Sequence, residues 1–477
     1  MHESPPSPPQ LPDAARQHYK PRRVLWDSLW DNKAVRAGVL ILLLGLCGLI
    51  ILALVREQTG TEGFLVGLGL AVLPVPLLIA AFRWMGGVEP KPWRNLVFAF
   101  AWGACAATLV ALLANGYATK WLLNTIDVAQ RSDGDKYGAT FVAPVVEESA
   151  KGAAILLLFL FRRRDFNGIV DGVVVAGITA TGFAFTENIL YLGNAFASDQ
   201  NFGYSGLQSV TAATFFMRVL MSPFAHPLFT SMTGLGFGFA ATLAARRRFL
   251  RVVAPLGALL TAMFLHGVWN GSAAFGGAGF LAVYALFMVP VFGLLTWLTI
   301  WSRQNELRVI RAHLQAYQAA GWFTPPEPLA LSSMRARGIA RDVARRSPAG
   351  TAAVRTVAEY ISFATSLAFL RHRAYRGIAE PDFQAREQEL LHRLWQRKDT
   401  AQPALAQAVT VAPPPAFAMP MPWPGAGPQP GWAPPPQGWP APTAAPGRPG
   451  AWTPQPGSGP GAPGGPGAWP PPGGWGR

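Results

Sequence analysis

The chain has 477 residues, of which 51% are hydrophobic and only 14% are charged. Soluble globular proteins carry about 25% charged residues, so this composition excludes an ordinary soluble domain and indicates that lipid surrounds much of the chain. The net charge of +15 does not indicate a nucleic-acid-binding protein, because the basic residues form short clusters beside apolar runs. Both cysteines, Cys47 and Cys105, lie within apolar runs, so we expect neither a disulfide framework nor a cysteine metal site.

Apolar runs long enough to cross a bilayer as helices recur through the first 301 residues. The first run, residues 39–55, has no small-residue cleavage site behind it, so we interpret it as a retained helix rather than a signal peptide. The pattern predicts eight spans. They are residues 37–55, 62–82, 95–115, 139–161, 167–192, 220–245, 252–274 and 278–301.

Lysine and arginine in the connections between these spans sort to one side of the membrane. Cytoplasmic loops hold an excess of these residues, and four clusters would lie inside if the spans alternate. The clusters are within residues 20–36, 83–94, 162–164 and 246–251. An even number of spans with both termini in the cytoplasm satisfies every loop, so we predict a multi-pass protein of the cell membrane. Residues 203–221 are less regular and are interpreted as an interfacial or re-entrant helix.

The sequence divides into four parts by composition. A polar cytoplasmic N-terminus covers residues 1–36, a transmembrane bundle 37–301, a basic cytoplasmic helical region 302–400, and a Pro-, Gly-, Ala- and Trp-rich tail 401–477. The predicted fold class is all-α: a polytopic membrane helical bundle with about eight transmembrane helices, a cytoplasmic helical region and a disordered tail. Proline-rich pieces of the tail would suit an SH3-like cytoplasmic partner, although a plain flexible tail is the simpler interpretation.

Adjacent glutamates lie inside the fourth predicted span, where each ionised group costs several kcal/mol and marks a candidate functional site. Lys151 follows Glu147 and Glu148 at helical spacings of four and three, so it can neutralise one carboxylate and leave the other for chemistry. A buried salt bridge between helices would explain one Glu–Lys pair but would leave the second glutamate unexplained.

Later spans add further polar groups. Asp171 lies near the inner end of the fifth span, and Glu187 and Asn188 lie near its outer end. Glu187 has no basic neighbour on its own helix, so its partner must be another helix or a metal. Of the seven histidines, only His226 and His266 fall within predicted spans.

These groups lie at similar depths in the predicted bundle. At 1.5 Å per residue, Glu147 and His266 lie roughly 12 Å below the outer boundary, His226 about 9 Å and Glu187 about 8 Å. Four helices therefore place their ionisable groups in one layer that is nearer to the outer side.

Two histidines with carboxylates and no cysteine match the ligands of catalytic zinc, which keeps an open position for water. A spare glutamate would then serve as general base. Without metal, a glutamate in an apolar setting would still activate water with histidine as its partner. Asn270 lies one turn beyond His266 and would donate to a developing oxyanion. Either route predicts hydrolysis of an amide within or beside the membrane.

The motifs resemble those of the PrsW-type intramembrane proteases, which are related to the CAAX-processing and bacteriocin-immunity protease superfamily. The family's E-E-x-x-K is similar to Glu147–Lys151, its D-G to Asp171-Gly172, and its G-F-x-x-x-E-N to Gly182–Asn188. Its two later histidine motifs resemble His226 and the H-x-x-x-N of His266–Asn270. Counting D-G and G-F-x-x-x-E-N as one, four motifs in order on predicted helices make the resemblance specific.

This resemblance covers residues 141–270 and implies a metalloprotease that cuts a membrane-anchored substrate near its extracytoplasmic side, such as an anti-sigma-factor-like regulatory protein. By analogy, Glu147 is the water-activating base and Glu148 its ion-paired or ligating neighbour. The first motif departs from the superfamily's E-E-x-x-x-R, and Glu187 stands where many relatives carry histidine; both departures favour the PrsW branch over a prenyl-protein protease. The assignments are catalytic Glu147, Glu148 and Asn270; metal-ligating Glu187, His226 and His266; and supporting Lys151, Asp171 and Asn188.

Two other classes of protein would also place ionisable groups inside helices. In many transporters and proton-coupled channels the site lies near the midplane between internal repeats, whereas this sequence has no repeat and its polar layer is nearer one surface. A catalytically silent membrane scaffold is the third class. The glutamates, both histidines and Asn270 are all present, so the sequence gives no sign of lost catalysis.

Overall fold

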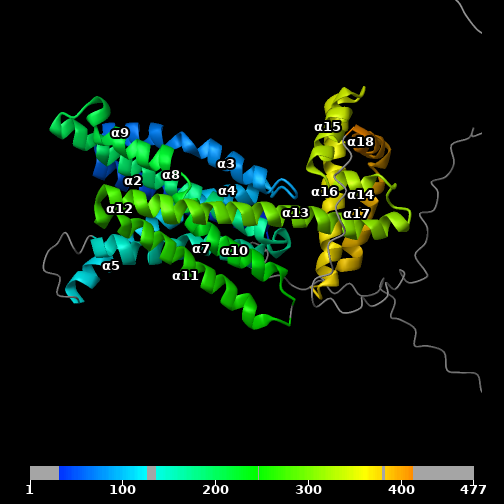
Figure 1. The fold of residues 1–477 in the computed structure, drawn as a ribbon, viewed down its shortest axis with the longest axis horizontal. Coiled ribbons are helices and arrows are strands. Elements are labelled where there is room, and N and C mark those ends of the chain that lie inside the picture. Colours follow the sequence, from blue (N-terminus) through cyan, green and yellow to red (C-terminus); the bar gives the residue numbers. More distant parts are fainter. Residues whose placement is uncertain (1–31, 126–135, 245, 379–381, 412–477) are drawn as a thin grey trace, which may run out of the picture. The chain divides into compact units, whose positions relative to one another are not determined.

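The structure is a computed structural model that describes residues 32–125, 136–244, 246–378 and 382–411. Every regular element among these residues is helical, in agreement with the all-α prediction (Figure 1). The N-terminus before residue 32 and the tail after residue 411 lie outside the described residues, so the predictions made for them stay predictions.

Ten α-helices in the described residues carry the predicted spans. They are α2 (Lys33–Val72), α3 (Pro74–Met85), α4 (Trp93–Ala101), α5 (Thr108–Thr125), α7 (Ala143–Phe161), α8 (Ile169–Phe202), α10 (Ala225–Thr242), α11 (Arg248–Ser272), α12 (Gly276–Val283) and α13 (Val289–Ala319). The π-helical turns η2 (Trp102–Ala107), η3 (Gly138–Val142), η6 (Phe216–Met221) and η8 (Tyr284–Met288) interrupt or extend them. Helix α9 (Val210–Phe215) and η6 form the segment expected to be an interfacial or re-entrant helix.

Four helical stretches of the described chain are long and apolar enough to cross a membrane: Ala34–Met85, Trp93–Ala118, Ile169–Phe202 and Arg248–Ala319. The first and last each contain two of the predicted spans. Helices α7 and α10 cover the other two but are more polar, since α7 carries three charged residues and α10 is rich in glycine and threonine. The structure thus supports a membrane protein with several spans, and the count of eight stays a prediction.

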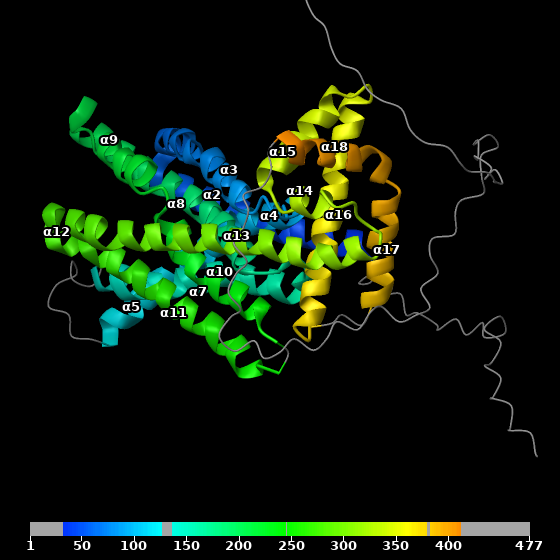
Figure 2. The same cartoon turned by 45° about the vertical axis from the view of Figure 1, so that its right-hand side comes forward.

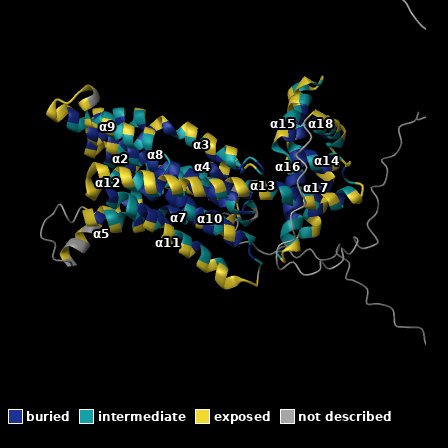
Figure 3. Cartoon of the chain, in the orientation of Figure 1, coloured by how far each residue is buried: buried dark blue, intermediate teal, exposed yellow. Residues whose placement is uncertain are grey.

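Helix α8 is the central helix of the membrane part and packs against α2, α3, α4 and α10 (Figures 1 and 2). The most apolar stretch of α8 is 89% buried, whereas those of Ala34–Met85 and Arg248–Ala319 are only 11% buried. Figure 3 shows the same contrast, with exposed residues along α11, α12 and α13 and buried ones inside the bundle. Apolar outer helices around a buried helix are expected where lipid is the solvent.

Glycines allow α8 to approach its neighbours closely. A Cβ added at Gly172 would lie 1.9 Å from the carbonyl oxygen of Gly234 on α10, and one at Gly182 would lie 2.1 Å from that of Phe100 on α4. No side chain fits at such distances, so both positions require glycine. These are the glycines of the D-G and G-F-x-x-x-E-N motifs, and their role is helix packing.

Helix α2 contains a kink at Gly60, whose φ of 72° is in the left-handed region that favours glycine. The Arg56 guanidinium donates to the Thr61 hydroxyl across this kink, at 3.3 Å. Ile51 and Ala71, on opposite sides of the kink, belong to one hydrophobic cluster that also contains Ile189 of α8. The two arms of α2 are therefore held together on α8.

The remaining helices form a second hydrophobic core with the C-terminal part of α13. They are α14 (Glu327–Leu331), α15 (Met334–Arg346), α16 (Gly350–Tyr375), α17 (Phe383–Trp395) and α18 (Lys398–Val411). Arg337 of α15 is 2% exposed and donates to the carbonyl oxygen of Val88, at 2.8 Å, which follows α3 in the membrane part. Burial lowers the pKa of Arg337 to about 10.

One predicted boundary differs from the structure. We assigned residues 401–411 to the disordered tail, but they belong to α18. Ala401, Ala404, Leu405 and Ala408 are buried and recur at the spacing of one helix face, so this segment contributes to the second core despite Pro403. The change in composition after residue 400 therefore precedes the end of the folded part.

Candidate metal centre

Three side chains from three helices converge in the middle of the bundle. Glu147 comes from α7, His226 from the first turn of α10 and His266 from α11. One carboxylate oxygen and one nitrogen of each imidazole all lie within 4.8 Å of one another. Glu147 and His266 are 6% and 1% exposed, and His226 is half-buried, so most of the group lies inside the bundle.

Each histidine of this trio is held by a carboxylate outside it. His266 Nδ1 lies 3.0 Å from Glu148 Oε1, and His226 Nε2 lies 2.6 Å from Glu187 Oε2. If each of these nitrogens carries the proton and donates it, His266 Nε2 and His226 Nδ1 keep their lone pairs, and Lys151 Nζ lies 3.4 Å from His226 Nδ1. Metal-ligating histidines are commonly oriented by a carboxylate in this way.

The two orienting carboxylates have their own cations. Glu148 is fully buried; it lies 2.6 Å from Lys151 Nζ and accepts a hydrogen bond from the Thr230 hydroxyl at 2.8 Å. Glu187 accepts a hydrogen bond from Arg218, which also donates to Asn188 Oδ1 at 2.8 Å. The guanidinium of Arg218 lies 3.9 Å from the ring centroid of Tyr191. Buried charge is thus paired on both sides of the trio.

Glu147 has weaker partners than the other two glutamates. Its Oε1 accepts a long hydrogen bond of 3.4 Å from Asn115, and its Oε2 lies 3.6 Å from Lys151 Nζ. Glu147 Oε2 is buried and accepts no hydrogen bond within the described residues. An unsatisfied buried carboxylate oxygen is costly, which indicates that a ligand completes its environment.

The donor set of the trio fits a divalent metal ion. Two imidazole nitrogens, one carboxylate oxygen and an open side are the ligands that catalytic zinc sites use. The unpartnered oxygen of Glu147 supplies the observation from this structure that such an ion would explain. Lys151 Nζ lies 3.6 Å and His266 Nε2 lies 3.8 Å from this oxygen, and both distances are too long for a hydrogen bond.

A cavity of about 1320 Å³ adjoins the trio. Glu147, Glu187 and His226 line it, and so do Lys120 and Asn124, which are exposed residues at the end of α5. Glu148 is not among the residues that line it. Of the adjacent glutamates, therefore, only Glu147 meets the cavity.

The structure brings most of the predicted site residues together. Asn270 lines the same cavity and donates to the carbonyl oxygen of Ala139 at 2.9 Å. Asp171 does not join the site, because it lies sixteen residues before Glu187 on the same helix, roughly 24 Å along its axis. There it forms an ion pair with Lys91 Nζ at 2.9 Å.

Sequence reasoning missed the roles of Arg218, Thr230 and Asn115. Arg218 lies in the irregular segment 203–221, to which the sequence analysis assigns no site residue. An arginine inside such an apolar segment is a signal in itself, since it needs a carboxylate partner. Nothing in the sequence distinguishes Thr230 or Asn115 from the other polar residues of their helices.

The fold and this site define a class of protein: a helical membrane protein whose buried carboxylate and histidines form a metal-type centre. Residues 91–295 match the model of the PrsW family of intramembrane metalloproteases. The matched residues include every member of the trio. The resemblance predicted from the motifs is thereby confirmed.

Two relatives are named Protease PrsW. The protein from Clostridioides difficile (strain 630) is 27% identical over 202 residues, which are 41% of this chain and 75% of the relative. The protein from Geobacillus kaustophilus (strain HTA426) is 29% identical over 128 residues, 27% of this chain and 48% of the relative. No solved structure matches the chain. The matches leave the second hydrophobic core and the tail without a counterpart in the family model.

Proposed function

We propose that this chain is an intramembrane metalloprotease that hydrolyses a peptide bond of a membrane-anchored protein near its extracytoplasmic side. The observation that carries the proposal is the convergence of Glu147, His226 and His266 beside a cavity of about 1320 Å³. The family resemblance supports, within this class, a regulatory substrate such as an anti-sigma-factor-like protein.

We assign Glu147, His226 and His266 as the residues that hold the metal, with zinc as the ion that suits them best. A bound zinc ion supplies a Lewis acid that polarises a carbonyl group and activates water. Glu147 takes the third position in place of Glu187, which the sequence had favoured, because Glu187 is already held by Arg218 and His226. Glu148 and Glu187 orient the two imidazoles and keep their tautomers fixed.

The cavity supports cleavage near the predicted outer side. It extends from Glu147 to Lys120 and Asn124, which precede the loop predicted to be extracytoplasmic. Water and an extended substrate segment would both enter by this route. Asn270 lines the cavity and is proposed to donate to the oxyanion that develops on the substrate carbonyl.

One observation favours a metal-free mechanism as the second candidate. Lys151 Nζ lies within 3.6 Å of both Glu147 and His226 Nδ1, so its ammonium group already supplies positive charge to the trio. In that mechanism Glu147 itself activates water as general base. The two candidates differ in whether the protein must contain metal.

The test measures bound metal and cleavage together. The purified full chain and its Glu147→Gln, His226→Ala and His266→Ala variants are reconstituted in liposomes with single-span test proteins. Glu62→Gln is the matched control, because Glu62 is an exposed glutamate on α2. We expect about one zinc per wild-type and control chain, and cleavage reduced at least about 100-fold in the three variants.

Each result separates the candidates. Cleavage by a wild-type protein without metal, retained in chelator, would establish the metal-free mechanism. Metal content that is unaffected in both His226→Ala and His266→Ala would refute the ligand assignment. Glu187→Gln should lower metal affinity less than Glu147→Gln; the reverse order would return Glu187 to the ligand set.

A further inference from the structure

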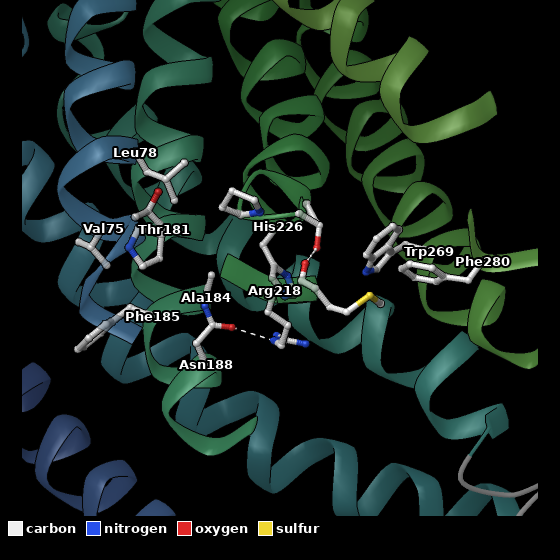
Figure 4. A pocket seen from close by; sticks show the side chains of 15 residues that line it. Val75, Leu78, Thr181, Ala184, Phe185, Asn188, Arg218, His226, Trp269 and Phe280 are labelled. Carbon is white, nitrogen blue, oxygen red and sulfur yellow. Dashed lines mark hydrogen bonds between the residues drawn. The ribbon is translucent and has the colours of Figure 1, made fainter. Parts of the chain in front are cut away.

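A second, smaller cavity of about 160 Å³ adjoins the candidate metal centre. His226 lines both cavities, and so do Arg218, Trp269 and Phe280. Figure 4 shows this space between α3 and α8 on one side and the paired rings of Trp269 and Phe280 on the other. Since Glu147 does not line it, this cavity is a separate compartment that meets the site at His226. We call it the side-chain pocket.

Apolar side chains line the side-chain pocket on both sides. Val75 and Leu78 of α3 and Ala184 and Phe185 of α8 lie on one side. On the other side, Phe280 of α12 packs on Trp269 with 4.8 Å between ring centroids. An apolar cavity of about 150 Å³ is large enough to bind benzene. The side-chain pocket therefore has room for one amino-acid side chain between leucine and phenylalanine in size.

Three of the polar side chains that line the pocket, Thr181, Ser222 and Arg218, already donate hydrogen bonds inside the protein. The Thr181 hydroxyl donates to the carbonyl oxygen of Gly177 at 2.7 Å, and that of Ser222 donates to Met217 at 2.6 Å. Arg218 donates to Asn188 and to Glu187, as the dashed line in Figure 4 shows for Asn188. A charged or strongly polar occupant would have to compete with these bonds, whereas an apolar occupant leaves them intact.

We propose that the side-chain pocket binds an uncharged, apolar substrate residue directly beside the bond that is cut, and so sets the sequence preference of the enzyme. The inference rests on the proposed protease function. Successive α-carbons of a peptide are 3.8 Å apart, so a substrate carbonyl held at the trio brings a flanking side chain within reach of a pocket that shares His226. The preferred residues are leucine, methionine and phenylalanine.

Two substitutions change the volume of the side-chain pocket in opposite directions. Ala184→Leu adds volume to the α8 wall, and Leu78→Ala removes volume from the α3 wall. A methylene group more or less in an apolar pocket changes discrimination about 10- to 200-fold. Ala184→Leu should lower the kcat/KM ratio of leucine to alanine substrates by that factor, and Leu78→Ala should raise the ratio of tryptophan to leucine substrates. Leu77→Ala is the matched control, because Leu77 is the neighbouring residue on α3 and is 71% exposed.

The experiment uses the full chain in liposomes with a library of synthetic single-span peptides, whose residues near the outer end of the span are varied. Mass spectrometry reads the bond that is cut and the residues on both sides of it. We expect one flanking position to be enriched in leucine, methionine and phenylalanine with wild type and Leu77→Ala. The preference should shift to alanine and glycine with Ala184→Leu, and to larger residues with Leu78→Ala.

The outcomes distinguish this inference from the proposed function. Cleavage with no preference, or with a preference that both variants leave unchanged, overturns the side-chain pocket and leaves the protease function standing. Equal loss of cleavage for all peptides in both variants also overturns it, since a lipid chain or a structural role would then explain the cavity. If wild type cuts no peptide, or if Glu147→Gln cuts the same peptides as wild type, the protease function fails and the inference fails with it.

Discussion

Glu147, Glu148 and Glu187 are chemically alike but have different surroundings. Glu148 is fully buried between Lys151, His266 and Thr230, and Glu187 is held by Arg218 and His226. Only Glu147 combines a place on the large cavity with an oxygen that accepts no hydrogen bond in the described part of the chain. A carboxylate with an unused oxygen is the one best able to bind a ligand.

The sequence could predict these residues but not their division of roles. Their presence in apolar segments and their helical spacings identify the layer, since ionised groups in lipid need partners. The partners themselves come from helices that are distant in sequence: Arg218 follows Glu187 by 31 residues, and His266 follows Glu148 by 118. No local pattern encodes such pairings. The sequence analysis therefore places Glu187 among the metal ligands, whereas our proposal assigns Glu147 to that position.

Thr230 offers a test of the carboxylate–histidine pairing. Thr230→Val removes the hydroxyl that donates to Glu148 at 2.8 Å, so Glu148 should hold His266 less firmly. Loss of a residue that supports the metal ligands without touching the metal typically costs about 10- to 100-fold in metal affinity or activity. The measurement is zinc affinity by competition with a chelator, together with cleavage of a test protein.

Thr233→Val is the matched control for this test. Thr233 lies one turn further on α10 and is 1% exposed, but its hydroxyl oxygen has no hydrogen-bond partner among the described residues. Removing an unsatisfied buried hydroxyl is neutral or stabilising. Equal losses of metal affinity in Thr230→Val and Thr233→Val would refute a specific role for Thr230.

At the scale of the helices, the sequence predicted where apolar segments lie better than where helices end. The fifth span was predicted to end at residue 192, but α8 continues to Phe202 and ends at Gly203, whose φ is 74°. The last ten residues are more polar, and Asp199 accepts hydrogen bonds from the backbone N–H groups of Val210 and Thr211. Hydropathy detects the part of a helix that lipid or protein would cover, whereas capping and tertiary bonds decide its end.

The close approach of α8 to α4 predicts the effect of Gly182→Ala. Its Cβ would lie 2.1 Å from the Phe100 carbonyl oxygen, so the helices must separate, at a cost of about 1 to 3 kcal/mol or more. Glu187 lies on the same helix about one turn further on, so cleavage should fall as well. Thermal unfolding of the protein in detergent measures the first effect. Gly257→Ala on α11, where a Cβ would meet nothing within 4 Å, should leave stability unchanged or slightly raised.

The contact between α13 and α16 predicts a pH dependence in the second hydrophobic core. His372 Nδ1 lies 3.0 Å from His313 Nε2, and burial, with the charges of His313 and nearby arginines, lowers the pKa of His372 from 6.5 to about 4. The unfolded chain therefore binds a proton on His372 between these values while the folded chain does not. The contribution of neutral His372 to the free energy of unfolding is therefore fully present above about pH 6.5 and is lost as the pH falls toward 4.

The expected loss is roughly 2 to 3 kcal/mol, since one pKa unit corresponds to about 1.4 kcal/mol. Amide hydrogen exchange of α16, corrected for the intrinsic effect of pH on exchange, measures it in the full chain. His372→Asn should show a smaller fall in stability between pH 7 and pH 4. The same slope in wild type and variant would contradict the assignment to His372.

At the scale of the whole molecule, the orientation of the membrane part is open to direct measurement. The distribution of basic residues predicts that Gly203 lies outside and Arg247 lies in the cytoplasm. Both residues lie at helix boundaries, so reporters fused after them disturb the fold little. We expect extracytoplasmic reporter activity at the first site and cytoplasmic activity at the second. Activity on the same side at both sites would refute the eight-span arrangement.

The kink at Gly60 bears on how the chain enters the membrane during synthesis. Between residues 37 and 82, only Arg56, Glu57 and Glu62 are charged, and all three lie next to the kink. The first two apolar segments thus leave the ribosome joined by a single turn instead of a loop. Such a pair can insert as one hairpin, so that only a few polar residues must cross the bilayer. Lengthening this turn would impose separate insertion of each segment and should lower the yield of correctly oriented protein.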